Sequence, residues 1–356
     1  MIKQCNKKGE INMAHNVETM AWTGDKPWHG LGVEVSNDLT PLQMQEAAKL
    51  DWTVSKRPSY TLDAPEWGED VGLIQAESTF HIVRDSDNRI LSHCGRDYVP
   101  IQNEDVFKFF KRFTEAGHMT METAGSLKDG GEIWGLAKIS EDFELAGEDL
   151  IKGYLLINQP HIVGRSLTIK LTPIRVVCNN TLTMALQQGG TASFRMPHVR
   201  EFGDDVMKTA EEALGLSAER MTAFKEAATL LSKKKAKHSN FLDFVGELYQ
   251  PDMISAYRKE AELKAQGKKI GEQAPLIEQF NTYPKLVVDA LERQPGANLA
   301  SSKGTWWGAL NAVTYVEDHL RESQTPGNSL HSAWFGAGAN RKAKALDLAI
   351  KYAKVA

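Results

Sequence analysis

The side chains best suited to bind a charged ligand lie within residues 150–200 of this 356-residue sequence. The stretch contains six basic residues and no acidic one: Lys152, Arg165, Lys170, Arg175, Arg195 and Arg200. Guanidinium and ammonium groups without carboxylate neighbours can bind phosphate oxygens through charge-assisted hydrogen bonds. A completely buried sheet would also exclude carboxylates, so both interpretations stay open at this point.

Two further groups extend this basic set. Phe194 stands directly before Arg195, and an aromatic ring beside guanidinium groups can stack on a base of a single strand while the cations hold its backbone. Lys233, Lys234 and Lys235 follow a helical pattern, where a lysine run is also typical of a solvated helix end. We predict a nucleic-acid-binding set of Lys152, Arg165, Lys170, Arg175, Phe194, Arg195, Arg200, Lys233, Lys234 and Lys235.

Three other places could support chemistry. Residues 311–319 place Asn311 and His319 on one helix, with Asp318 beside them, as a polar site for a metal-dependent hydrolase or as a buried hydrogen-bonded network. Cys178 stands between an expected strand and a helix over 181–187, as a nucleophile or as a buried structural thiol. Gly336 and Gly338 precede the last helix, whose first turn carries Arg341 and Lys342 and could hold a phosphate.

Composition and missing motifs narrow the class of protein. The net charge of -4 and pI of about 6.2 exclude a uniformly basic protein. No Walker A, H-E-x-x-H or G-x-S-x-G motif occurs, so we expect no nucleotide or metal cofactor, and a non-enzymatic role is the favoured one. Three cysteines without a C-x-x-C pair, and no apolar run of membrane-spanning length, predict a cytoplasmic protein that does not enter a membrane.

The patterns predict an α+β fold. Strands are expected at 71–74, 79–84, 89–93, 119–127, 132–139, 154–157 and 167–171, with helices at 41–49 and 103–115. After residue 200 the sequence is helical, at 204–214, 217–232, 239–249, 252–265, 284–293, 305–321 and 339–354. We predict a disordered leader over 1–12, a β-rich core domain over 13–200 and a helical domain over 201–356.

Alternation within residues 166–171 decides how the basic residues would be presented. Leu167, Ile169 and Leu171 alternate with Ser166, Thr168 and Lys170, which gives one apolar face and one polar face. The pattern favours a sheet with one solvated face that carries Lys170. Ile174, Val176 and Cys178 alternate with Arg175 in the same way, which makes Arg175 a second candidate for a solvated face.

Several longer motifs resemble a known family. They are MAHN at 13–16, PWHGLG at 27–32, LDWTV at 50–54, YVPIQN at 98–103, PIRVVCNNTL at 173–182, and NAVT with DH at 311–314 and 318–319. They resemble the phage- and plasmid-like proteins with domain of unknown function 932. The resemblance implies a mobile-element origin and a natural start at Met13, and it brings no established catalytic mechanism.

A fainter likeness concerns the order of elements. A helix, the residues Asp51 to Val54, three strands and a helix are similar to the core of Rad52-type single-strand annealing proteins. Those proteins form rings that hold single-stranded DNA by its backbone in a basic groove. We therefore expect a homo-oligomeric protein that binds single-stranded DNA and promotes annealing or recombination, and the likeness implies a ring as its form. The alternatives are a module that inhibits a host protein and a metal-dependent hydrolase or nuclease.

Overall fold

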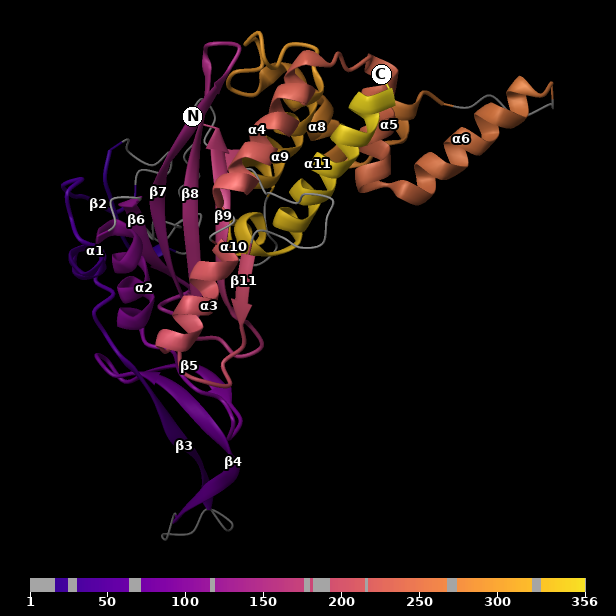
Figure 1. The fold of residues 1–356 in the computed structure, drawn as a ribbon. Coiled ribbons are helices and arrows are strands. Elements are labelled where there is room, and N and C mark those ends of the chain that lie inside the picture. Colours follow the sequence, from indigo (N-terminus) through magenta and orange to yellow (C-terminus); the bar gives the residue numbers. More distant parts are fainter. Residues whose placement is uncertain are drawn as a thin grey trace, which may run out of the picture.

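The computed structural model describes residues 17–24, 31–63, 72–115, 119–175, 180–181, 193–214, 217–267, 274–321 and 328–355. It confirms the α+β class: the first part is rich in strands, and the part after residue 200 is mostly helical (Figure 1). The expected leader, the helix over 181–187 and Cys178 lie outside the described residues, apart from Thr181, which ends a short strand.

The main sheet has eight strands in the order β10-β9-β8-β7-β6-β1-β2, and β11 also pairs with β9. Neighbouring strands of this sheet are antiparallel, except that β1 and β2 are parallel. The strands are β1 (Val17–Trp22), β2 (Val33–Glu34), β6 (Met119–Leu127), β7 (Glu132–Leu145), β8 (Asp149–Pro160), β9 (Leu167–Arg175), β10 (Asn180–Thr181) and β11 (Ser193–Met196).

A separate three-stranded sheet consists of β3 (Val54–Asp63), β4 (Gly72–Arg84) and β5 (Arg89–Cys94). It extends away from the main sheet as an arm (Figure 1). The sequence predicted two strands at 71–74 and 79–84, but the structure has the single strand β4. Residues 76–79, in its polar middle, have no partner in the register with β3, and the pairing resumes beyond them because the register shifts between Pro58 and Tyr60.

The helices agree closely with the sequence pattern. They are α1 (Pro41–Ala47), α2 (Asn103–Glu115), α3 (Asp204–Leu214), α4 (Ser217–Lys233), α5 (His238–Tyr249), α6 (Pro251–Ala265), α7 (Leu276–Gln279), α8 (Thr282–Arg293), α9 (Trp306–Tyr315), α10 (Asn328–Phe335) and α11 (Ala337–Val355). A π-helical turn, η2 (Val316–Leu320), continues α9. The sequence pattern did not predict α7 and α10.

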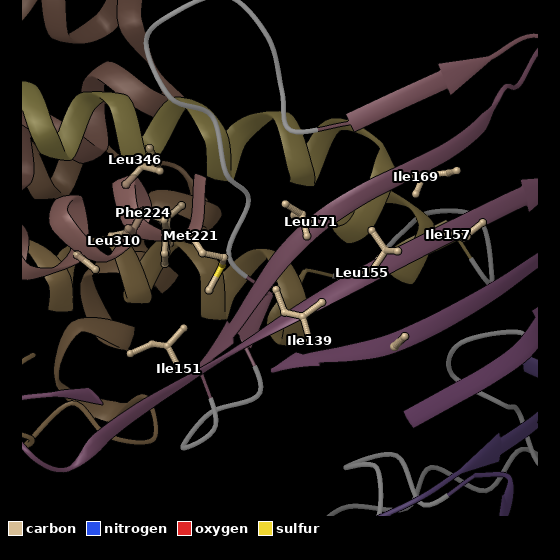
Figure 2. Close-up of a cluster of buried hydrophobic side chains, with 14 of the residues drawn as sticks. Ile139, Ile151, Leu155, Ile157, Ile169, Leu171, Met221, Phe224, Leu310 and Leu346 are labelled. Atoms are coloured by element: carbon tan, nitrogen blue, oxygen red, sulfur yellow. The ribbon is translucent and has the colours of Figure 1, made fainter. Parts of the chain in front are cut away.

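The largest hydrophobic cluster, here the main core, joins one face of the main sheet to the helices. Strand residues such as Ile151, Leu155 and Ile157 belong to this cluster together with Phe224 and Leu310 of the helices (Figure 2). Both predicted domains supply side chains to it, because residues from Ala21 to Ala353 take part. Burial of this apolar surface is the main force that fixes the sheet against the helices. Independent folding of the two parts stays a prediction.

The opposite face of the main sheet carries a smaller apolar cluster. Trp134, Tyr154 and Leu156 belong to it, and Trp334 and Phe335 of α10 pack against it. The two faces follow from strand alternation, since neighbouring side chains point to opposite sides. Within the described ranges, no helix combines the length and apolar character that a membrane span requires.

Candidate nucleic-acid interface

Three of the predicted basic residues meet on the sheet face that α10 covers. Leu167, Ile169 and Leu171 point into the main core, as the alternation predicted, so Lys170 points to the other face. Ser193 of β11 pairs with Lys170, and Arg195 pairs with Thr168, which brings Arg195 onto the same face as Lys170. Arg195 is exposed, whereas Lys170 is partly buried beneath α10.

A buried carboxylate holds the third residue, Arg165, at this face. Glu132, at the start of β7, is completely buried and forms ion pairs with Arg165 and with Lys128, whose Nζ lies 2.7 Å from Oε1. His331 of α10 adds its Nδ1 at 2.6 Å from Glu132 Oε2. Burial is the main cause that lowers the pKa of Lys128 to about 8.

Lys170 has the most perturbed ammonium group of this face. Its Nζ donates a hydrogen bond to the Trp334 carbonyl oxygen and lies 5.0 Å from the centre of the Phe335 ring. Burial lowers the pKa of Lys170 to about 7, and the nearby charges of Lys342 and Arg195 lower it further, while Asp318 opposes them. Lys170 therefore titrates near neutral pH and is surrounded by other cations.

Lys342 links this face to the helical part. Its side chain is buried, and its Nζ lies 2.5 Å from Asp318 Oδ1 in η2. Glu317, the preceding residue, accepts hydrogen bonds from Arg341 at 2.7 Å and from the Tyr249 hydroxyl at 2.8 Å. The π-helical turn places the two neighbouring carboxylates against different partners, and such turns are frequent at functional sites.

We call Lys128, Arg165, Lys170, Arg195 and Lys342 the cationic cluster. The carboxylates in contact with it are Glu132 and Asp318. Cations therefore exceed these carboxylates, even when Lys170 is neutral. A phosphate group would supply the missing negative charge through charge-assisted hydrogen bonds. The arrangement can bind an anion, and its residues come from β9, β11, α11 and two loops.

Arg175 corrects the prediction of a solvated basic pair. Its side chain is fully buried, with Nε 2.7 Å from Asp149 Oδ1 and Nη2 2.7 Å from Ser302 Oγ. Five residues beyond Lys170, it points to the same side as Leu171, toward the main core. Its guanidinium balances the buried Asp149 carboxylate, so in this structure it is not accessible to a phosphate.

Two other predicted residues, Phe194 and Lys152, lie apart from the cluster. Phe194 packs against the main core, on the face opposite Arg195, because neighbouring residues of β11 alternate. Its ring is therefore not beside the cluster as a stacking surface. Lys152 is half-buried and lies on the cluster's face, but it pairs with Ile174, four residues along β9 from Lys170.

Arg200 and the lysine run lie outside the cluster. Arg200 is exposed in the loop before α3, with Nη1 3.8 Å from Asp205. Lys233 and Lys235 are exposed at the end of α4, where Lys235 pairs with Thr305. Gly296 and Ser302, in the loop before Thr305, accept hydrogen bonds from Arg175, which ends β9 five residues beyond Lys170. These residues form separate basic surfaces.

The alternative sites of the sequence show no catalytic grouping among the described residues. Asn311 donates to the Trp307 carbonyl oxygen, and Asp318 pairs with Lys342. No group of three or more metal-ligating side chains occurs within the described ranges. The polar side chains of α9 and η2 thus take part in separate interactions, with carbonyls of their own helix and with Lys342 of α11.

Comparison with known proteins gives one match. A family model described as "Domain of unknown function (DUF932)" matches residues 90–334, which is more than half of the chain. The chain belongs to the DUF932 family. The DUF932 match includes Lys128, Arg165, Lys170, Arg195 and His331 and ends within α10. No curated protein and no solved structure matches the chain significantly.

Sequence reasoning missed Lys128, Glu132 and His331 as members of this site. Lys128 lies in the turn between two correctly predicted strands, and its acidic partner Glu132 follows four residues later. His331 stands in α10, which the pattern did not reveal. Lys342 did have a signal, since the sequence places it after Gly336 and Gly338 at the start of the last helix, although α11 begins at Ala337 and Lys342 lies in its second turn. Only the fold joins these segments.

Proposed function

We propose that this protein binds single-stranded DNA through the cationic cluster and acts in annealing or recombination on a mobile genetic element. The observation that carries the proposal is the convergence of Lys128, Arg165, Lys170, Arg195 and Lys342 on one sheet face with an excess of positive charge. Phosphate contacts supply most of the affinity of such binding and require no covalent chemistry.

The element order supports the likeness to Rad52-type annealing proteins. Helix α1, the three strands of the arm and helix α2 follow one another as the sequence predicted. This support is at the level of fold analogy. The phage or plasmid origin rests on the motif resemblance stated above, to which the family match adds membership of DUF932.

A homo-oligomer is part of this proposal. One face of the outer end of the arm exposes three large apolar side chains: Tyr60, Leu62 and Leu73. Two strands without a core of their own are marginally stable in water, and an exposed apolar group is typical of an interaction surface. A second copy of the chain is the partner that the annealing function needs.

The direct test measures binding of a labelled oligothymidine by fluorescence anisotropy across a series of salt concentrations. We expect binding at low salt that weakens linearly in log–log form as salt rises. Arg195→Gln removes an exposed member of the cluster, and we expect weaker binding with a salt slope reduced by about one. Arg293→Gln, an exposed arginine of α8, is the matched control and should bind as the unaltered protein does.

No binding at low salt would exclude the proposal. Binding without a salt slope would also exclude it, because phosphate contacts must release counterions. Equal losses in Arg195→Gln and Arg293→Gln would show binding that does not depend on the cluster.

A further inference from the structure

The residues that would contact phosphate are already occupied by a helix of the same chain. His331 of α10 lies against Glu132 and Arg165, and the Trp334 carbonyl oxygen accepts the hydrogen bond of Lys170. Phe335 covers the Lys170 ammonium group with its ring. A peptide carbonyl oxygen thus takes the position that a phosphate oxygen would take, but it carries no full negative charge.

The contact of His331 cannot satisfy both of its partners. Its Nδ1 lies 2.6 Å from Glu132 Oε2 and 3.1 Å from Arg165 Nη1. A ring nitrogen that donates to the carboxylate cannot accept from the guanidinium, and one that accepts from the guanidinium faces the carboxylate with its lone pair. One of the two contacts is therefore unfavourable while α10 is in place.

Burial under α10 also opposes the charges of the cluster. The pKa of Lys170 falls to about 7 and that of Lys128 to about 8, in both cases chiefly because burial disfavours the charged ammonium. Burial lowers the pKa of Arg165 as well. Removal of the helix would restore water to these cations, so the docked position is held mainly by the apolar contacts of Trp334 and Phe335.

Helix α10 is short and is joined to α11 by a tight corner. The helix has eight residues, fewer than an isolated helix needs to be stable in water. It joins α11 through a corner at Gly336, whose N–H donates to the carbonyls of His331 and Ser332. At Gly338 a Cβ would lie 2.9 Å from the Ser332 carbonyl oxygen, so the corner is close-packed and requires glycine.

We propose that α10 is a removable cover on the cationic cluster and that the backbone of a bound nucleic acid displaces it. This inference rests on the proposed function, because it names the element that controls access to the same site. In the covered state Lys170 and Arg165 are shielded, and Arg195 is the exposed residue at which the strand first binds.

The first experiment tests the cover without any nucleic acid. The full-length protein is treated with an amine-acetylating reagent, and the rate of modification of Lys170 is measured by mass spectrometry relative to the exposed Lys237. Trp334→Ala removes the indole ring that packs against Trp134 and leaves the Phe335 ring over Lys170 in place, so it weakens the docked state, and we expect Lys170 to react at least about threefold faster. Phe113→Ala, which truncates a half-buried phenylalanine of α2, is the matched control and should leave the relative rate unchanged.

The second experiment uses the unaltered protein and measures hydrogen exchange of residues 331–335 with and without an oligothymidine. Displacement predicts faster exchange of these amides in the complex. Slower or unchanged exchange in the complex overturns the proposal, as does an unchanged Lys170 rate in Trp334→Ala. If no oligonucleotide binds, the proposed function fails and displacement by nucleic acid fails with it, while the acetylation result still shows whether α10 opens.

Discussion

The guanidinium of Arg175 is held between the Asp149 carboxylate and the Ser302 hydroxyl, with no exposed surface on either charged side chain. Ser301 and the Trp307 indole also donate to Asp149 Oδ2, at 2.6 and 2.9 Å. The network joins β8 and β9 to the loop before α9 and to α9 itself. Truncation of one partner would leave a buried charge without compensation.

We therefore expect Arg175→Gln to lower the free energy of unfolding by about 3–5 kcal/mol. Urea denaturation followed by circular dichroism measures this change. Oligonucleotide affinity of the folded fraction should be unchanged, because the side chain is remote from Arg195. A stable variant with reduced affinity would instead return Arg175 to the binding set.

His161 predicts a pH dependence of stability. Its imidazole is completely buried, with Nε2 2.8 Å from Asn103 Oδ1, and burial lowers its pKa to about 3 from an ordinary 6.5. The unfolded chain binds a proton to this group below pH 6.5, whereas the folded chain resists protonation down to about pH 3. Stability should therefore fall as pH decreases through this window.

The measurement is the midpoint of urea unfolding at intervals between pH 7 and pH 4. His161→Gln keeps a donor for Asn103 and removes the titration, so its stability should decline less steeply with acid than that of the unaltered protein. Parallel declines would show that other groups cause the pH dependence.

The sequence could predict which face Lys170 takes, but not what covers it. Strand alternation is local, and it placed Leu167, Ile169 and Leu171 in the core correctly. The same alternation would have assigned Arg175 to the core side, but a charged residue there requires Asp149, 26 positions earlier, as a buried partner. Such pairing depends on tertiary contacts that no local pattern contains.

At the scale of elements, the start of helix α1 is determined by residues that are adjacent in the sequence, Thr40, Pro41 and Gln43. The Thr40 hydroxyl accepts from the Gln43 N–H at 3.3 Å, and the Gln43 side chain accepts from the Thr40 N–H at 2.9 Å. This capping box satisfies two backbone donors that would otherwise lack partners. Pro41 at the first helical position adds a preset backbone angle.

Thr40→Ala should lower the free energy of unfolding by about 1 kcal/mol, because the cap hydroxyl is lost. Thr40→Ser keeps the hydroxyl and should be close to neutral. Urea unfolding of both variants checks the prediction, and equal destabilisation of the two would mean that the Thr40 methyl group, not the hydroxyl, stabilises the helix start.

Elements that the sequence missed or misjudged have specific causes. Helix α10 is too short to show several turns of periodicity, and its apolar residues Trp334 and Phe335 serve a separate cluster on the sheet. The continuation of α9 as η2 also changes the apolar stripe. Leu320, at the end of η2, is 39% exposed because the wider π turn rotates it away from the buried side of α9.

At the scale of the whole molecule, the arm is the least self-sufficient part. β5 pairs with β4 only from Phe80 to Arg84, so the outer segment contains just β3 and β4. Leu62 pairs with Leu73 there, and Tyr60, two residues from Leu62, lies on the same face. Leu62 and Leu73 are 66% and 69% exposed. No other part of the described chain covers this face, so burial of these side chains requires a partner.

A second copy of the chain is the partner that the proposed annealing role favours, and Leu62→Lys tests it. The charge would be buried in an interface on this face, so we expect the assembly to dissociate toward monomers at micromolar concentration in sedimentation velocity. Thr61→Lys adds the same charge to the opposite face of the same strand, so the assembly should persist in this control.

Oligonucleotide affinity should fall in Leu62→Lys alone, because a single DNA strand that contacts several linked copies binds more tightly than one that contacts a single copy. An unaltered protein that is monomeric with and without oligonucleotide would contradict the annealing mechanism, while binding of single strands by the cationic cluster of one copy would still stand.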